Sequence, residues 1–481
     1  MNFSNSSSKR IKLILTAAIL LATIPRLIIN YGMDGDATRS ALAAENLFRT
    51  GSYLPSRLPG NPLFEYMLSL IVPWSGHFGS NLSVFFFYIL SLWAFSILAN
   101  TRKSAGLLKV TYALTPAILL NSATTMDYIP GLAFLLLALV CVSKFHPFWG
   151  SILLGISIGF RISNALFALP LAMFQLKRLK KRKVSLYFLL SILVGLAFYI
   201  PILNKSGLSA FSIAESAPEP ITYLVHTTYR SLMLFGPVAT AGIAIIVFLN
   251  RKNIRSSFKT SLEENPPWLL LEISSVILFT VLFLYHSDET AYLLPAVPFV
   301  LLLLSRWLPK AQLMIAACLI LSFSLVSVEL KGGQSGRRSL TFRLSHGCLV
   351  KDYLERKEIE SLKNALGSFQ YSAKAVILTG MGPILTFQNP HLKECSDEIV
   401  PLLLNDGSWN EREIHRIKGS EVYLFYSLSK ENVELLKAQG FKIFVFSAYA
   451  PSIAMINYGY APEEVGIEKL EVLNQNAFYK Q

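Results

Sequence analysis

The polar residues with the clearest chemical potential lie together in one segment of the chain, DGDATRSALAAENLFRTGSYLPSRLPGNPLFEYMLSLIVP, which starts at Asp34. Asp34 and Asp36 form an Asp-x-Asp pair, and such a pair of carboxylates can hold a divalent cation. Arg39 and Arg57 carry the planar guanidinium fork that matches phosphate oxygens. The segment therefore combines acids that could accept a proton with arginines that could bind a phosphate.

Each acid in this segment also has a structural alternative. Asp36 stands before ATRSALAAENLF, and Asp is a strong N-cap residue for such a helix. Glu65 could orient a sugar or a phosphate, or it could be a satisfied carboxylate at a helix start. Residues 37–49 have the pattern of an amphipathic helix at a membrane surface, and residues 62–72 that of a second, more apolar one.

The whole chain has the composition of a membrane protein. Of its 481 residues, 53% are hydrophobic and 15% are charged, and the mean hydropathy is +0.46. Soluble domains carry roughly 25% charged residues. The formal net charge of +14 does not point to nucleic acid, because the basic residues cluster in short loops between apolar runs. We therefore expect a membrane-embedded protein with no nucleic-acid partner.

About eleven apolar runs have the length that a bilayer core requires. The first run is predicted to stay in the protein as a span, because no small-residue cleavage site follows it. One pair of short runs could instead form a single kinked helix, namely 148–161 with 163–177. The predicted spans are 12–31, 83–100, 106–121, 129–144, 148–161, 163–177, 185–204, 229–250, 267–285, 290–308 and 311–329.

The basic residues predict how these spans are oriented. Every second loop is basic, as in KRLKKRK (Lys177 to Lys183) and RKNIR (Arg251 to Arg255), which predicts that these loops and the N-terminus are cytoplasmic. The loop 31–82 and everything after the last span then lie on the outer side. We expect a multi-pass protein of the inner (plasma) membrane, with its active site and C-terminal domain on the periplasmic or extracellular side.

Two further arginines interrupt apolar stretches on the predicted outer side, Arg161 and Arg230. A charge within a span costs free energy and is a functional hypothesis by default. Both are therefore candidates for phosphate binding. The alternative is an arginine that extends its guanidinium to the membrane interface.

The composition changes near residue 330, which predicts two domains, 1–330 and 331–481. In the second, residues 375–380, 421–427 and 441–447 have the pattern of buried strands, and 429–440 that of a helix N-capped by Ser429. This order predicts a small α/β domain with a parallel strand pair, in an accessory or acceptor-facing role. Cys348 and Cys395 could form a disulfide in an oxidising compartment.

The order of motifs in roughly residues 10–330 resembles the GT-C superfamily of polyprenyl-phosphate-sugar-dependent glycosyltransferases. The nearest branch contains bacterial relatives of protein O-mannosyltransferases and of the aminoarabinose transferase of lipid A. DATR (Asp36 to Arg39) stands where those enzymes have Asp-Glu-x-Arg. GSYLPSRLPGNPLFEY stands where they have Gly-Asp-Trp-x-x-Pro-x-x-x-Gly and Phe-Glu-Lys-Pro-Pro. GISIGFRISNALFALP and AYLLPAVPFVLLL resemble a mid-chain motif and a late-span motif of the family.

Two positions depart from the family pattern. Tyr66 stands where the aminoarabinose branch has a Lys that contacts phosphate. Ala291 stands where the late motif has an Arg, although Asp288 and Glu289 come just before it. Tyr292 is expected to shape the late span.

The resemblance implies a polytopic all-α transmembrane bundle with amphipathic helices in its first outer loop. It implies an inverting hexosyl- or pentosyltransferase of the cell envelope, as in lipopolysaccharide modification, that moves a sugar from a polyprenyl-phosphate donor to a lipid, glycan or protein acceptor. Asp36 is the expected catalytic base. A divalent metal at Asp34 and Asp36 is left open, and no cofactor is certain. The expected substrate-binding residues are Asp34, Arg39, Arg57, Glu65, Arg161, Arg230 and Glu289.

Two other functions are compatible with the same topology. A transporter or flippase for a lipid-linked saccharide would typically have paired repeats and broken helices in matching positions, and the sequence has no internal repeat. A non-catalytic membrane scaffold, whose C-terminal domain recruits a partner, is the other alternative. Substitution of Asp36 discriminates these classes, because only the transferase needs a base.

Overall fold

The computed structural model describes most of the chain, and it divides into two compact units. The first contains residues 1–31 and 40–353, and the second contains residues 32–39 and 354–481. The predicted boundary at residue 330 stays a prediction. The described residues are 3–102, 104–211, 220–287, 289–332, 340–367, 373–379, 392–394, 396–404, 414–425, 428–446 and 462–470.

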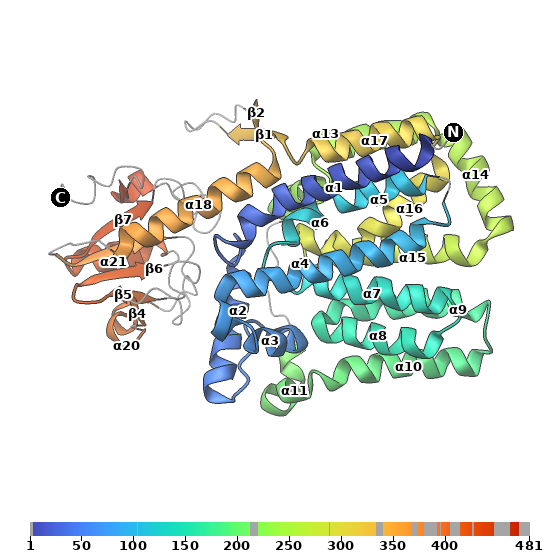
Figure 1. Ribbon diagram of the computed structural model, residues 1–481. Coiled ribbons are helices and arrows are strands. Elements are labelled where there is room, and N and C mark those ends of the chain that lie inside the picture. Colours follow the sequence, from blue (N-terminus) through green and yellow to red (C-terminus); the bar gives the residue numbers. More distant parts are fainter. Residues whose placement is uncertain are drawn as a thin grey trace. The chain divides into compact units, whose positions relative to one another are not determined.

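The first unit is mostly helical, as Figure 1 shows. Helices α4, α7, α8 and α10 lie side by side in this order, and α9 packs against α15. Its helices are α1 (Phe3–Leu27), α3 (Pro62–Ser69), α4 (Val72–Ala99), α5 (Ala105–Ala113), α6 (Pro116–Asn121), α7 (Tyr128–Ser143), α8 (Pro147–Phe160), η1 (Ile162–Phe167), α9 (Ala168–Leu176), α10 (Lys181–Ala197), α11 (Ile200–Ser206), η2 (Gly207–Phe211), α12 (Pro220–Met233), α13 (Pro237–Leu249), α14 (Arg251–Glu264), α15 (Pro266–Tyr285), η3 (Thr290–Ala296), α16 (Val297–Trp307) and α17 (Lys310–Ser322).

Several of these helices are long and apolar enough to cross a bilayer, so the protein is an integral membrane protein. Within the described residues there are three, Val72–Ala99, Pro266–Tyr285 and Thr290–Trp307, and a bent pair, Tyr223–Met233 with Pro237–Leu249, could form a fourth. Five further apolar helices are shorter, with 10–17 residues. The count of about eleven spans therefore stays a prediction.

Prolines and polar residues explain why several predicted spans are interrupted. The run 106–121 is divided into α5 and α6 at Pro116, which cannot donate a backbone hydrogen bond to the preceding turn. The runs 148–161 and 163–177 form separate helices. Helix α8 ends at Phe160, and Arg161, the last residue of the first run, has an extended backbone (φ −150°, ψ 113°) that interrupts the helix. The last run ends early, at Ser322, and Val326 begins a strand.

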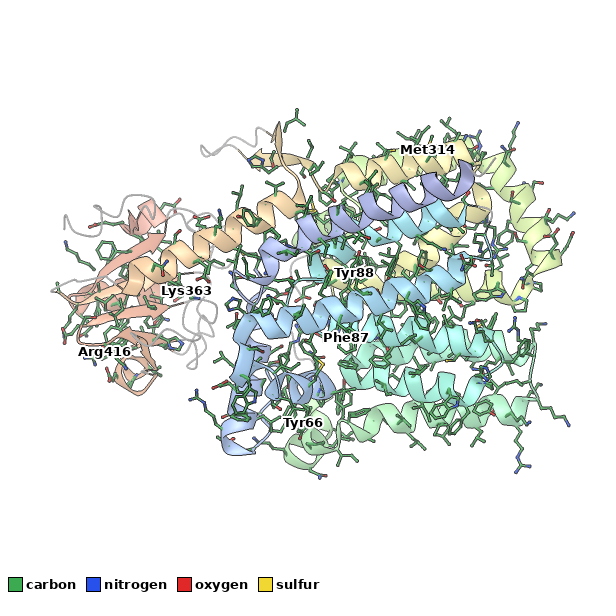
Figure 2. The ribbon with its side chains drawn as sticks, viewed as in Figure 1. Tyr66, Phe87, Tyr88, Met314, Lys363 and Arg416 are labelled. Atoms are coloured by element: carbon green, nitrogen blue, oxygen red, sulfur yellow. The ribbon has the colours of Figure 1, made fainter. Side chains whose placement is uncertain are left out.

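Aromatic stacking and a buried hydrogen bond hold helix α4 against helix α5. Tyr88 on α4, marked in Figure 2, is fully buried, and its hydroxyl donates to the carbonyl oxygen of Ala113 at 2.6 Å. Phe95 stacks on Tyr112 with 4.3 Å between the ring centroids. These contacts fix α4 against α5.

The predicted helices of the first outer loop are present. Helix α2 (Gly35–Thr50) covers the predicted run 37–49, and α3 covers most of the run 62–72. Ala37, Ala41 and Ala44 form the buried face of α2 at four- and three-residue spacing, while Phe48 is 48% exposed.

The second unit contains a small mixed sheet. Its strand order is β4-β5-β6-β3-β7-β8, and β3 pairs in parallel with both β6 and β7. The predicted strands and the predicted helix α21 (Lys430–Ala438) are confirmed, and the Ser429 side chain accepts from the backbone N–H of Asn432 as an N-cap. The strands are β3 (Ala375–Leu378), β4 (Leu392–Glu394), β5 (His415–Ile417), β6 (Val422–Phe425), β7 (Lys442–Phe446) and β8 (Glu468–Leu470).

Between the last predicted span and this sheet lie elements that the sequence pattern did not predict. An antiparallel hairpin joins β1 (Val326–Gly332) to β2 (Leu340–His346). Helix α18 (Cys348–Gly367) follows it, and the short helices of the second unit are α20 (Ser396–Ile399), η4 (Val400–Leu402) and η7 (Pro462–Val465). Cys395 lies outside the described residues, so its pairing with Cys348 stays a prediction.

Candidate functional site

The centre of the candidate site is a buried ion pair between Arg161 and Asp127. Arg161 follows the last residue of α8, and Asp127 precedes the first residue of α7. Nη1 of Arg161 lies 2.7 Å from Oδ2 of Asp127, and the two side chains are 6% and 1% exposed. Burial of an ion pair is costly unless the geometry is good, so this pair is an unusual feature for the end of an apolar bundle.

Close packing of α7 on α8 positions this pair. The Ser157 hydroxyl donates to the carbonyl oxygen of Gly131 at 2.7 Å, and Asn164 donates to the Ser157 hydroxyl at 2.9 Å. A Cβ atom on Gly131 would lie 2.7 Å from Nδ2 of Asn164. Gly131 thus lets α7 approach close enough for Asp127, one turn earlier, to reach Arg161.

Two tyrosine rings flank the same guanidinium. The Cζ atom of Arg161 lies 4.0 Å from the ring centroid of Tyr128 and 4.6 Å from that of Tyr292. Both distances are within the range of cation–π attraction, which is stronger where the cation is desolvated. Tyr292 therefore helps to hold Arg161, and its expected role in shaping the late span stays a prediction.

Arg57 joins this centre from the loop between α2 and α3. Its Nη2 lies 3.5 Å from Oδ1 of Asp127, and its Nη1 lies 3.7 Å from Oε1 of Glu289. We call Arg57, Asp127, Arg161 and Glu289 the arginine–carboxylate network. The structure thus brings together three of the residues predicted from sequence, through a fourth that was not predicted.

Asp127 could have been found from its position. It stands in TTMDYIP immediately before a run of apolar residues. An acid at the edge of a span is a functional hypothesis by the same argument that singled out Arg161. The sequence does not show its partner, because residue 127 precedes the predicted span 129–144 whereas residue 161 ends the predicted span 148–161.

The arginine–carboxylate network and its neighbours have hydrogen-bonding groups that its ion pairs do not use. The bond to Asp127 uses one of the five N–H donors of Arg161. The Tyr128 hydroxyl and Oδ1 of Asn164 are buried and have no hydrogen-bond partner among the described residues. Unpaired buried polar groups are rare in native proteins and call for an explanation such as a bound ligand or water. The arrangement can therefore accept an additional polar group, and the tyrosine hydroxyl and the arginine N–H groups would donate to an anion.

Glu65 lies on α3, next to the loop that carries Arg57, and its carboxylate is hydrogen-bonded within the protein. It is fully buried, and its carboxylate accepts hydrogen bonds from the Ser56 backbone N–H at 3.1 Å, from the Ser56 hydroxyl and from the Tyr53 hydroxyl. Burial raises the pKa of Glu65, and the hydrogen bonds from Ser56 and Tyr53 oppose that shift. The alternative of a satisfied carboxylate at a helix start fits these contacts better than direct substrate binding.

In the second unit, the structure separates the roles of the two aspartates at the start of α2. Oδ1 of Asp34 accepts from the backbone N–H of Asp36 at 2.9 Å, which is the geometry of an N-cap. Asp36 itself stands in the first turn, where its Oδ1 lies 2.9 Å from Nη1 of Arg39. The capping role that was an alternative for Asp36 is thus performed by Asp34. As for a metal, Ca²⁺ takes six or more oxygen ligands, whereas Mg²⁺ is usually bound through one or two carboxylates together with waters and phosphate oxygens, so these two acids leave a divalent metal open.

We expect Asp34→Ala to destabilise the start of α2 by about 0.5–2 kcal/mol, because the helix loses its cap. Asp34→Asn should change stability much less, since Asn caps helices about as well as Asp. Thermal unfolding of the purified protein measures both variants. Equal stability of Asp34→Ala and the wild-type protein would contradict the capping role.

Arg230 does not join the arginine–carboxylate network. Its side chain is exposed, and its backbone carbonyl accepts from the Thr290 hydroxyl at 2.9 Å. Within the described part of the chain its guanidinium forms no ion pair. A role in substrate binding for Arg230 stays a prediction.

A second buried ion cluster lies at the other end of α15. Glu272 is fully buried and lies 3.2 Å from Nη2 of Arg306, and Arg102 forms a further ion pair with it. Arg102 follows the predicted span 83–100, and Arg306 lies in the last turn of α16, near the end of the predicted span 290–308. Glu272 stands 13 residues before Tyr285, the last residue of α15, which corresponds to about 20 Å along a helix. Both arginines therefore meet Glu272 in the half of α15 that is farther from Tyr285.

No protein-family model and no curated protein matches the sequence. Among solved structures, the apo form of ArnT from Cupriavidus metallidurans matches 63% of this chain and 59% of its own, with 15% identity and a TM-score of 0.45. The chain is structurally similar to ArnT. The form of ArnT bound to undecaprenyl phosphate matches 74% of this chain and 65% of its own, with 12% identity and a TM-score of 0.40.

ArnT is a GT-C membrane glycosyltransferase, so the resemblance predicted from the sequence motifs is confirmed as a similarity of structure over most of the chain at low identity. The chain spans less than two thirds of the length of either ArnT structure. With both TM-scores below 0.5, the likeness to ArnT carries no residue roles and no activity over to this chain.

Proposed function

We propose that this protein is an inverting glycosyltransferase of the inner (plasma) membrane. It moves a hexose or pentose from a polyprenyl-phosphate donor to a lipid, glycan or protein acceptor at the outer face. The observation that carries the proposal is the arginine–carboxylate network, in which two arginines from different segments share the buried carboxylate of Asp127. Such a network at the end of apolar helices is suited to a phosphate that arrives on a lipid.

The chemistry follows from the residue types. In a single displacement, the acceptor oxygen bonds to the anomeric carbon while the bond from that carbon to the phosphate oxygen breaks, which inverts the configuration. The phosphate leaves with the electron pair, and Arg57 and Arg161 stabilise its added charge. Fixed N–H donors are most effective where water is excluded, and Arg161 is almost completely buried.

Asp36 is the proposed general base that takes the proton of the acceptor hydroxyl. Its support is the position in the motif DATR together with the capping geometry, which assigns the N-cap to Asp34 and leaves the Asp36 carboxylate without that structural role. Arg39 contacts it at 2.9 Å and would keep the carboxylate oriented. A divalent metal at Asp34 and Asp36 stays open.

The location of the site determines the class of donor. Charged nucleotide sugars do not cross a bilayer unaided, because burying their charge in hydrocarbon is too costly. A transferase at the outer face therefore needs a donor carried on a lipid. The apolar helices would supply the surface for the polyprenyl chain, and the C-terminal α/β domain, on the same side, would face the acceptor.

We expect Asp36→Asn to reduce glycan modification in cells by about 10²–10⁴-fold, the usual contribution of a general base. The amount of protein in the membrane and the flipping of lipid-linked saccharides should not change. Glu45→Gln, which removes a carboxylate that pairs with the exposed Arg49 on the same helix, is the matched control. The readout is the intact mass of surface glycolipids and glycoproteins.

Two outcomes would count against this function. Normal modification by Asp36→Asn would exclude Asp36 as the base. Loss of lipid flipping in a deletion strain, with every surface glycan still made by other enzymes, would favour the transporter.

A further inference from the structure

The loop that carries Arg57 is closed around the buried carboxylate of Glu65. One oxygen of that carboxylate accepts from the backbone N–H and the hydroxyl of Ser56, and the other accepts from the hydroxyl of Tyr53. Both oxygens are thus occupied by donors from a stretch of four residues. Ser56 immediately precedes Arg57, so the last fixed point of the loop is one residue away from the guanidinium that joins the network.

Other contacts hold the same loop against α3. The rings of Tyr53 and Tyr66 stack with 5.3 Å between their centroids. Gly60 has a positive φ of 82°, and a Cβ atom there would lie 2.8 Å from the Tyr53 hydroxyl oxygen and 2.9 Å from Cβ of Pro55. The loop therefore packs closely around the Tyr53 hydroxyl, and Glu65 is the acceptor for that hydroxyl.

Arg57 reaches the network through ion pairs with Asp127 and Glu289. Its two N···O distances of 3.5 and 3.7 Å exceed those of ordinary N–H···O hydrogen bonds. The side chain is 26% exposed, and partly exposed ion pairs stabilise a single geometry only weakly. The backbone of the loop places the Cα atom of Arg57 directly after Ser56, so a shift of Ser56 would move the guanidinium relative to Asp127.

We propose that Glu65 is a positioning residue, which holds Tyr53 and Ser56 so that Arg57 presents its guanidinium to the donor phosphate beside Asp127. We call the hydrogen bonds from Tyr53 and Ser56 to Glu65 the clamp. The clamp follows from the contacts above, and its consequence for donor binding rests on the proposed function. This assignment replaces the expected role of Glu65 in contacting substrate. It names Tyr53 and Ser56 as the residues through which Glu65 acts.

Hydrogen–deuterium exchange of the full-length protein in lipid nanodiscs tests the clamp without any assay of activity. We expect the Ser56 amide to exchange about tenfold faster in Glu65→Ala, because the loss of one hydrogen-bonded acceptor is usually worth about that factor. Tyr53→Phe, which deletes one of the donors to Glu65 and keeps the ring stack, should accelerate exchange less. Glu45→Gln should leave it unchanged. Unchanged Ser56 exchange in Glu65→Ala and Tyr53→Phe would overturn the clamp.

A double-mutant cycle tests the link to Arg57, with the dissociation constant for undecaprenyl phosphate as the measurement. We expect Glu65→Ala to weaken binding about tenfold in the wild-type background and to have little further effect in the Arg57→Ala background, because coupled residues are not additive. An equal loss in both backgrounds would overturn the proposal, since Glu65 would then act without Arg57. If Glu65→Ala does not fold, Ser56→Ala takes its place in the cycle, because it deletes a donor to Glu65.

The two proposals fail in different ways. If the wild-type protein does not bind undecaprenyl phosphate, the proposed function is contradicted at its donor, while the exchange of the Ser56 amide still decides whether Glu65 holds the loop. If the protein binds the lipid and Ser56 exchange does not respond to Glu65, the clamp is wrong and the proposed function stands.

Discussion

Arg161→Met is expected to lower the rate of sugar transfer by about 10²–10³-fold and to destabilise the folded protein by about 3–5 kcal/mol. The stability effect arises because Asp127, with a 1% exposed side chain, would keep a buried charge without its closest partner. The activity effect arises because Arg161 is proposed to stabilise the departing phosphate. Removing one preorganised donor to a developing oxyanion typically costs about 10²–10³ in kcat. Transfer assays and thermal unfolding measure the two effects separately.

A second substitution separates the structural role of this pair from its chemical role. The double variant Arg161→Met, Asp127→Asn has no unpaired charge, so we expect it to recover most of the lost stability, as other buried ion pairs do when both partners are replaced. It should not recover transfer, because the guanidinium is still missing. A double variant that is both stable and active would show that the pair is purely structural. A double variant that stays as unstable as the single one would contradict the ion-pair account of stability.

Glu272→Gln is expected to have the second largest effect, again about 3–5 kcal/mol on the free energy of unfolding. Glu272 is fully buried on α15, and Arg102 and Arg306 both pair with it. The amide keeps the size of the side chain but leaves two arginines without a counter-charge. Thermal unfolding in detergent or nanodiscs measures the loss.

This cluster lies at the opposite end of α15 from the candidate site, so its loss should act on stability alone. The fraction of Glu272→Gln that remains folded is expected to bind undecaprenyl phosphate with the wild-type affinity. Adding Arg306→Gln should restore part of the stability, because one of the two unpaired charges is removed. Weaker lipid binding by well-folded Glu272→Gln would contradict the separation of the two clusters.

Local sequence determined the membrane character of the chain. It also determined the helices between the first two predicted spans, and the strands and helix of the sheet domain. Apolar runs, the helical spacing of residues 37–49 and the strand patterns near 375, 421 and 441 each report on a single element. The predicted side of each loop also rests on local sequence, because it follows from the basic residues. Arg161 could be chosen as a candidate because a charge within an apolar run is conspicuous by itself. Arg57 was a candidate because its guanidinium matches phosphate, and Glu289 because it precedes the late family motif.

Only the tertiary structure decided which of these residues meet and what each one does. Asp127 joins Arg57 to Arg161 across 70 and 34 positions of sequence, and no local pattern predicts such a contact. From the sequence, Glu65 could equally contact substrate or hold the loop that carries Arg57. Its burial and its hydrogen bonds from Tyr53 and Ser56 distinguish these two roles. The sequence allowed Asp36 to be the N-cap of α2, but the helix begins at Gly35, so Asp34 is the N-cap residue. Residue type fixes what a side chain can do, whereas its partners depend on how distant segments pack, and packing is decided by the free energy of the whole fold.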